Sequence, residues 1–134
     1  MPLNLMEHYL VLTDDIDHTR DFYINILGLA DGFRPDLGFP GYWLYLDKTP
    51  VLHIAEWETY SAHSKKVGIP VSTRANSTGA FDHIAFNGTA PEEMESCLTS
   101  AGIPFGRNDV PHAGLVQFFL NDPNGIKIEL NFTV

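Results

Sequence analysis

The chain has 134 residues, a length that fits one domain or two very small modules sharing a core. Its net charge is -9 and its eight Lys and Arg residues are scattered, which argues against nucleic-acid binding because phosphate recognition needs clustered cations. No apolar run is long enough to span a membrane and no secretory signal pattern opens the chain, so we expect a cytoplasmic protein without a membrane partner. The single cysteine, Cys97, excludes an internal disulfide framework.

The first half of the sequence predicts a strand, a helix and a pair of strands. Alternating apolar and polar residues indicate the strands, and an apolar stripe at helical spacing indicates the helix. Asp14 and Asp15 offer an N-cap for this helix, and Gly28 ends it. The expected bounds are 7–13 for the first strand, 17–27 for the helix, and 42–46 and 51–57 for the strand pair.

Residues 58–79 separate the two halves and are polar, with no clear period. Structureless connections of this length are uncommon inside compact domains and usually act as linkers or lids. We therefore expect a single domain over 1–134, with one module over 1–57 and a second over 80–134. The segment between them is expected to be a connector that folds over a site.

The second half repeats this order of elements. Thr89 followed by Glu92 forms a capping-box pattern before a helix that starts with Pro91. The segment 121–125, Asn-Asp-Pro-Asn-Gly, is a strong turn signal between the last two strands. The expected bounds are 91–101 for the helix, 81–87, 103–105, 115–120 and 126–132 for the strands, and 108–114 for a loop.

Landmarks in the two halves stay in register. His8 and His83 lie 75 positions apart, and His53 and Glu129 lie 76 positions apart. A four-stranded module of this size cannot bury its apolar face alone, whereas two modules side by side can. The sequence therefore predicts an α+β fold of two modules, with the helices outside and the inner sheet faces curving around a cleft.

The same four residues all fall on the strand face opposite the apolar stripe. They occupy the first and the last strand of each half, so a pseudo-twofold axis would bring His8, His53, His83 and Glu129 to one point. Three imidazoles and one carboxylate are a ligand set for Fe, Mn, Co, Ni or Zn. The alternative is four unrelated polar residues on a solvated face, because a one-residue slip reverses the faces of a strand.

Motifs in both halves resemble those of one known family. They are His8 with Asp14, Phe22-Tyr23, Leu27-Gly28-Leu29, Val51-Leu52-His53, Phe81-Asp82-His83-Ile84-Ala85-Phe86, Asn121-Asp122-Pro123-Asn124-Gly125 and Ile128-Glu129-Leu130. This set resembles the vicinal oxygen chelate superfamily, which includes glyoxalase I, extradiol dioxygenases, fosfomycin-resistance transferases and bleomycin-binding proteins. The resemblance implies two βαβββ modules that pair into an open, cupped, barrel-like mixed sheet around one divalent metal.

The resemblance also implies a ligand set. By position, His8, His83 and Glu129 are similar to the two histidines and the glutamate that hold Fe(II) in extradiol dioxygenases. His53 stands where glyoxalase I-like enzymes place a further ligand, usually a carboxylate, so the chain departs from both patterns. Three protein ligands leave three positions on a six-coordinate metal, which suits ring cleavage, whereas four leave two, which suits isomerisation of a chelated substrate. The resemblance favours Fe2+, with Mn2+, Ni2+, Co2+ or Zn2+ as alternatives.

Weaker candidates lie near these ligands. His112 precedes a strand and could overhang the cleft as a general base, or be an exposed loop histidine. Gln117 and Trp43 occupy matching positions in the two halves and could contact the substrate or the ligands, with Tyr45 on the face of Trp43. Packing is the alternative role for each of these three residues.

The function implied by the resemblance is that of a metal-dependent enzyme. It would chelate a small substrate through vicinal oxygens. Extradiol ring cleavage is the first candidate reaction, and a glyoxalase-type isomerase or lyase reaction is the alternative. A non-catalytic small-molecule-binding protein, like the bleomycin-resistance members, is a third reading, and the presence of all four candidate ligands counts against it. Because family members often dimerise, some by exchanging modules, we expect a homodimer.

Overall fold

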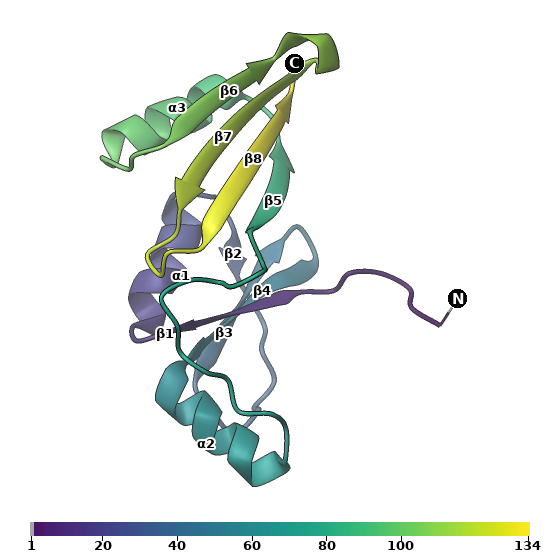
Figure 1. The fold of residues 1–134 in the computed structure, drawn as a ribbon, viewed down its shortest axis with the longest axis vertical. Helices are drawn as coiled ribbons and strands as arrows, with labels where there is room; N and C mark the ends of the chain where they lie inside the picture. The colour runs from purple at the N-terminus through teal and green to yellow at the C-terminus, as the bar shows by residue number, and fades with distance from the viewer. Residues whose placement is uncertain (1) are drawn as a thin grey trace. The chain divides into compact units, whose positions relative to one another are not determined.

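The structure, a computed structural model, describes residues 2–134 and divides the chain into two compact units, Met1–Arg74 and Ala75–Val134. Each unit contains a four-stranded mixed sheet (Figure 1). The elements of unit 1 are β1 (Tyr9–Thr13), α1 (Ile16–Asn25), β2 (Ala30–Asp31), β3 (Gly41–Leu46), β4 (Thr49–Glu56) and α2 (Trp57–Val67). Those of unit 2 are β5 (His83–Gly88), α3 (Pro91–Ser100), β6 (Gly106–Val110), the 3-10 helix η1 (Pro111–Ala113), β7 (Leu115–Asn121) and β8 (Lys127–Thr133).

The two sheets have the same topology. The strand order is β1-β4-β3-β2 in unit 1 and β5-β8-β7-β6 in unit 2. In each sheet the first and last strands of the module pair in parallel, and the other neighbours pair antiparallel. This repetition confirms the predicted α+β fold of two βαβββ modules. The two mixed sheets are not closed into a barrel.

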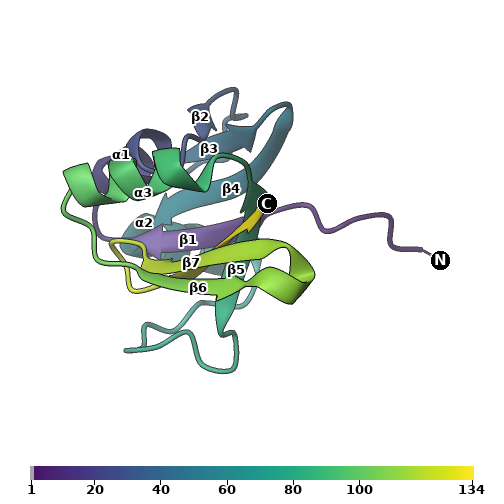
Figure 2. The same cartoon turned by 90° about the horizontal axis from the view of Figure 1, so that it is seen from above.

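The core of unit 1 lies between its sheet and α1. The alternation seen in the sequence buries Val11, Leu52 and Ile54 on one sheet face, and α1 covers them with the fully buried Tyr23. Figure 2 shows α1 along β3, and α1 contacts both β3 and β4. As predicted, the side chain of Asp15 caps α1 by accepting a hydrogen bond from the backbone N–H of His18.

The core of unit 2 follows the same rule. The residues Ile128, Leu130 and Phe132 of β8 are buried, as their alternation predicts. Phe118 of β7 and Leu98 of α3 are fully buried, and the ring centroids of Phe118 and Phe132 are 5.2 Å apart. Burial of this stripe leaves the alternate residues of β8 on the opposite face. The register of both sheets therefore follows the apolar pattern, and this fixes the face on which the candidate ligands lie.

The segment 58–79 differs from its prediction as an irregular connector, because α2 forms directly after β4 and belongs to unit 1. The residues Tyr60, His63, Ser64 and Val67 follow helical spacing, but only one of them is aliphatic, which hides the amphipathic period. Gly68 ends the helix in the left-handed conformation, with φ of 82°. The module bounds 1–57 and 80–134 stay a prediction.

Two local predictions in the second half are also wrong. The N-cap of α3 is Ala90, which makes no side-chain capping bond, so Thr89 lies one residue too early for the capping box. The strand expected over 103–105 instead runs over Gly106–Val110, into the expected loop. This exposed strand has the polar sequence Gly-Arg-Asn-Asp-Val and forms by pairing with β7, which its local pattern does not indicate. Among residues 2–134, no helix has the length and apolar character needed to cross a membrane.

Candidate metal centre

In unit 1 three aromatic rings form a stack. His53 lies on the central strand β4, opposite Trp43 of β3, and His8 directly precedes β1 on the other side. The ring centroids of His8 and His53 are 3.6 Å apart with planes 15° from parallel, and those of His53 and Trp43 are 4.2 Å apart with planes 7° from parallel. The His53 ring is therefore held between the two others.

The His53 ring is uncharged in this environment. Its Nε2 atom is buried and has no hydrogen-bond partner within residues 2–134. Burial, together with the nearby His8 ring, lowers the pKa of His53 to about 4. A neutral imidazole with a free, buried nitrogen could bind a metal, or could serve as a flat surface for the neighbouring rings.

The stack limits which of the two rings can bind the same ion. The lone pair of an imidazole nitrogen lies in the plane of its ring, and metal–nitrogen distances are about 2.1 Å. Because the His8 and His53 rings lie face to face, an ion in the plane of one ring lies well outside the plane of the other. As stacked, only one of these two histidines directs its lone pair at a given ion.

Unit 2 brings a histidine and a carboxylate together. His83 is the first residue of β5, and Glu129 lies on the neighbouring strand β8, where Ala85 is its partner. The Nε2 atom of His83 is 3.7 Å from Oε1 of Glu129, and the Glu129 side chain is only 16% exposed. Both groups therefore face the same small region of the sheet, as their strand alternation predicts.

The acidic residue before His8 and the one before His83 each orient the histidine that follows. Nδ1 of His8 is 2.8 Å from a carboxylate oxygen of Glu7, and Nδ1 of His83 is 2.7 Å from one of Asp82. Such a bond places the proton on Nδ1 and leaves Nε2 free as a metal ligand. The acid–histidine pair occurs in both halves, and this repeated dipeptide is the sequence signal that would have revealed Glu7 and Asp82.

A chain of amide side chains holds Glu129. Asn131 donates to Oε2 of Glu129 at 2.8 Å, Gln117 donates to Asn131 at 3.0 Å, and Asn108 donates to Gln117 at 2.8 Å. Gln117 thus acts on the carboxylate through Asn131. Asn131 shares the predicted face of Glu129, but Asn108 lies on β6, whose position the sequence did not indicate.

The structure joins neither His112 nor Tyr45 to the candidate ligands. His112 lies on the exposed helix η1, and within residues 2–134 no hydrogen bond or ring contact links it to His83 or Glu129. The Tyr45 hydroxyl donates to the backbone carbonyl of Phe33 at 2.6 Å, which ties β3 to the loop that precedes it. Trp43, by contrast, contacts His53 directly.

Each unit supplies half of the predicted ligand set. Within residues 2–134, no group of three His, Cys, Asp or Glu side chains is arranged to hold a metal ion. The two pairs, His8 with His53 and His83 with Glu129, nevertheless offer nitrogen and oxygen donors of the kind that Fe, Mn, Co, Ni and Zn accept. The donor chemistry and the oriented Nε2 atoms therefore fit a divalent metal.

The fold agrees with comparisons to known proteins. A family model described as Glyoxalase/Bleomycin resistance protein/Dioxygenase superfamily matches residues 5–130. The chain belongs to this superfamily. Its members are typically dependent on a divalent metal, bind small molecules and often form dimers. The superfamily includes glyoxalase and lyase enzymes.

One curated protein is similar in sequence, and solved structures share the fold. "Glyoxylase I 4" of Arabidopsis thaliana is 29% identical over 96% of this chain and 72% of that protein. Among solved structures, lactoylglutathione lyase from Agrobacterium tumefaciens has a TM-score of 0.63 and 18% identity over 98% of this chain and 96% of that chain. A fosfomycin resistance protein, FosX, from Listeria monocytogenes has a TM-score of 0.67 and 13% identity over 98% and 95% of the two chains.

One prediction concerns the half-buried His53 ring. Its folded-state pKa of about 4 lies below the unfolded value of about 6.5, so the unfolded chain binds the proton more readily. Stability from the neutral ring is complete above pH 6.5 and is lost as the pH falls toward 4. Between pH 7 and pH 4, we expect the free energy of unfolding of the metal-free natural protein to fall by about 1–2 kcal/mol more than that of His53→Gln. This range allows for solvent screening of a partly exposed ring, and urea unfolding measures it. Parallel pH curves for the two proteins would contradict this prediction.

Proposed function

We propose that this chain is a divalent-metal-dependent enzyme that binds a small substrate through vicinal oxygens. His8, His83 and Glu129 are the proposed ligands. The observation that carries the proposal is the matching orientation of two histidines by a preceding carboxylate, which leaves each Nε2 free. Their side chains are almost equally exposed, 34% for His8 and 36% for His83, as expected of equivalent positions in the two modules.

The roles of the protein groups follow from their contacts. A bound metal would act as a Lewis acid that polarises the substrate oxygens and lowers their pKa. Glu7 and Asp82 hold the two imidazoles in the tautomer that binds through Nε2. Asn131 holds one carboxylate oxygen of Glu129, so that the other oxygen stays free. His53, neutral and stacked on His8, supports that ring without adding charge.

Extradiol ring cleavage with Fe2+ is the reaction that we place first. The support is the face-to-face stack of His8 and His53, which favours three protein ligands over four. Two histidines and one carboxylate are the typical set of non-haem Fe(II) oxygenases. Three ligands leave more of the coordination sphere to the substrate than four do, which suits a chelated catechol.

A glyoxalase-type isomerase or lyase is the second candidate. It is favoured by the similarity to "Glyoxylase I 4" and to the fold of lactoylglutathione lyase. This hypothesis requires the His53 ring to leave its stacked position between His8 and Trp43 and to become a fourth metal ligand. A binding protein without catalysis is a weaker candidate, because it does not call for two separately oriented histidines.

Metal loading and substrate panels separate these functions. We expect purified protein reconstituted anaerobically with Fe2+ to hold about one metal per chain and to consume oxygen with a panel of catechols. Metal binding with isomerisation of a hemithioacetal, and without oxygen uptake on any catechol, would favour the second candidate. Absence of stoichiometric metal after reconstitution with Fe2+, Mn2+, Ni2+, Co2+ or Zn2+ would favour the binding protein.

We also propose that the protein is a homodimer, as superfamily members often are. Sedimentation velocity at micromolar concentration is expected to give a species of twice the 15.0 kDa chain mass. A single 15.0 kDa species at that concentration would contradict this proposal.

A further inference from the structure

A cavity of about 280 Å³ lies beside the stacked rings of unit 1. Its lining includes His8, His53 and Trp43 together with Phe39 and Tyr60. Ligand pockets usually measure about 300–1,000 Å³ and are mostly apolar with a few polar groups. This cavity lies just below that range, which suits a molecule with one planar ring. Its position against His8 makes it a natural place for the body of a substrate.

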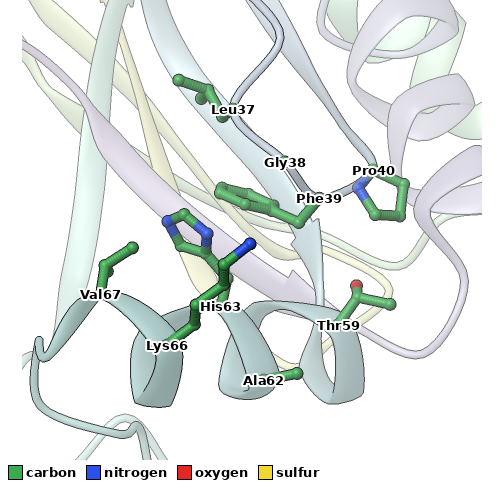
Figure 3. Close-up of a pocket in the computed structure, with 9 residues that line it drawn as sticks. All are labelled: Leu37, Gly38, Phe39, Pro40, Thr59, Ala62, His63, Lys66 and Val67. Carbon is green, nitrogen blue, oxygen red and sulfur yellow. The ribbon is translucent and has the colours of Figure 1, made fainter.

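Helix α2 provides a fixed wall for this cavity. The ring of Phe39 packs on α2, with its centroid 5.3 Å from that of Tyr60 and 4.6 Å from that of His63. Figure 3 shows Phe39 reaching over His63 in a second cavity of about 340 Å³, so the two rings belong to the walls of both cavities. The helix that the sequence did not predict therefore limits the space beside the candidate ligands.

Arg34 brings a positive charge to the same cavity, and the Asp36 carboxylate acts on it only from beyond ion-pair distance. Its Nη2 donates to the backbone carbonyl of Phe39 at 2.9 Å, and its guanidinium carbon lies 4.9 Å from the centre of the Phe39 ring. Within residues 2–134 it forms no ion pair, and partial burial lowers its pKa. The other arginines, Arg20, Arg74 and Arg107, each have a carboxylate oxygen within 2.7–3.1 Å. A partly buried charge without a directly bonded counter-ion is costly, and an anionic ligand in the cavity would lower that cost.

The backbone next to Arg34 is shaped to admit its side chain. A Cβ atom at Gly41 would lie 3.0 Å from Nη2 of Arg34 and 2.3 Å from the carbonyl oxygen of Ile54. Only glycine fits at this position without displacing one of these groups. The guanidinium is thus held by the Phe39 carbonyl, the Phe39 ring and the bare backbone at Gly41, with further N–H donors left for a ligand.

We propose that Arg34 binds a carboxylate of the substrate, so that the enzyme acts on a small, single-ring acid that also carries vicinal oxygens. This inference rests on the proposed function, because it places the body of the substrate beside His8. A guanidinium matches the planar carboxylate in a two-bonded geometry. Arg34 is therefore a specificity-determining residue, and a carboxylated catechol is the substrate class for the ring-cleavage reaction.

The test uses metal-free, full-length protein and three single-ring probes. Benzoate, the neutral isostere benzamide and phenylphosphonate are titrated in a carboxylate-free buffer while the indole N–H signal of Trp43 is followed by NMR. We expect benzoate to bind about tenfold more tightly than benzamide and more tightly than phenylphosphonate. Tighter binding of phenylphosphonate would overturn the assignment to a carboxylate.

Three variants locate the discriminating charge. Arg34→Gln is expected to bring the benzoate-to-benzamide affinity ratio to about one, and Arg34→Lys to keep part of it, because lysine retains the charge but lacks the planar pair of donors. Arg107→Gln, which removes a carboxylate-paired arginine outside the cavity, is the matched control and should keep the full ratio. Equal binding of benzoate and benzamide to the natural protein, or an unchanged ratio in Arg34→Gln, would overturn the proposal.

The outcome is independent of metal binding. Because the probes are measured without metal, failure of metal uptake with retained benzoate selectivity would remove the proposed enzyme function alone. Conversely, metal uptake without benzoate selectivity would remove only the role of Arg34. Thermal unfolding of each variant distinguishes a local loss of charge from a disturbed 34–41 loop.

Discussion

Replacing Glu129 by Gln is expected to lower the affinity of the protein for a divalent metal by more than a hundredfold. The substitution keeps the size of the side chain and its bond from Asn131, but it removes the negative charge that faces His83. His83→Gln should have an effect of the same order, because it removes the Nε2 donor. Calorimetric titration of the metal-free proteins with Mn2+ measures both losses.

The groups that orient these ligands should have a smaller effect. Asp82 bonds Nδ1 of His83, and Asn131 bonds Oε2 of Glu129. Removing such supporting groups typically lowers metal affinity by about 10–100-fold. The metal affinities of Asp82→Asn and Asn131→Ala are therefore expected to lie between that of the natural protein and those of Glu129→Gln and His83→Gln.

His53 decides the number of ligands in the same experiment. If it only supports the His8 ring, His53→Gln should change metal affinity by less than the two supporting variants do. A loss as large as that of His83→Gln would instead make it a fourth ligand and favour the isomerase reading. His18→Gln, a change at an exposed histidine, is the matched control and should leave the titration unchanged.

Strand faces were the most predictable part of this molecule. The alternation of apolar residues along β8 predicts that Glu129 lies on the strand face opposite Ile128 and Leu130. In the structure Ile128 and Leu130 are buried, and Glu129 is more exposed. A residue pattern of period two carries this information locally, without any knowledge of the rest of the chain. The duplication was visible for the same reason, since each module repeats its own local patterns.

Features that depend on tertiary contacts could not be predicted. Helix α2 forms with aromatic and small polar residues on its packed face, so its period is weak until Phe39 is known to lie against Tyr60 and His63. Strand β6 is polar and exposed, and it exists because β7 offers it a partner. Asn108 reaches the amide chain only through that pairing, which explains why the sequence indicated Gln117 and missed Asn108.

Phe118→Ala is expected to cost about 3–5 kcal/mol of the free energy of unfolding, the range for deleting a buried aromatic ring. Phe118 is fully buried on β7, with its ring centroid 5.1 Å from that of Phe105 and 5.2 Å from that of Phe132. The lost ring leaves a cavity that strands held in a sheet can fill only partly. Because small proteins are stable by about 5–15 kcal/mol, this is a large share of the total.

Urea unfolding followed by circular dichroism measures this cost, and Phe81→Ala is its matched control. Phe81 is the same residue type in the same unit but is 55% exposed, so its replacement should change stability by no more than about 0.5 kcal/mol. Phe118→Leu keeps most of the side-chain volume, so its free energy of unfolding should lie between those of Phe118→Ala and Phe81→Ala. Phe118 is also the neighbour of Gln117 along β7, so loss of this packing should loosen the amide chain and weaken metal binding in Phe118→Ala alone. Equal stabilities for Phe118→Ala and Phe81→Ala would show that the buried face of β7 is not the core that holds Glu129 in place.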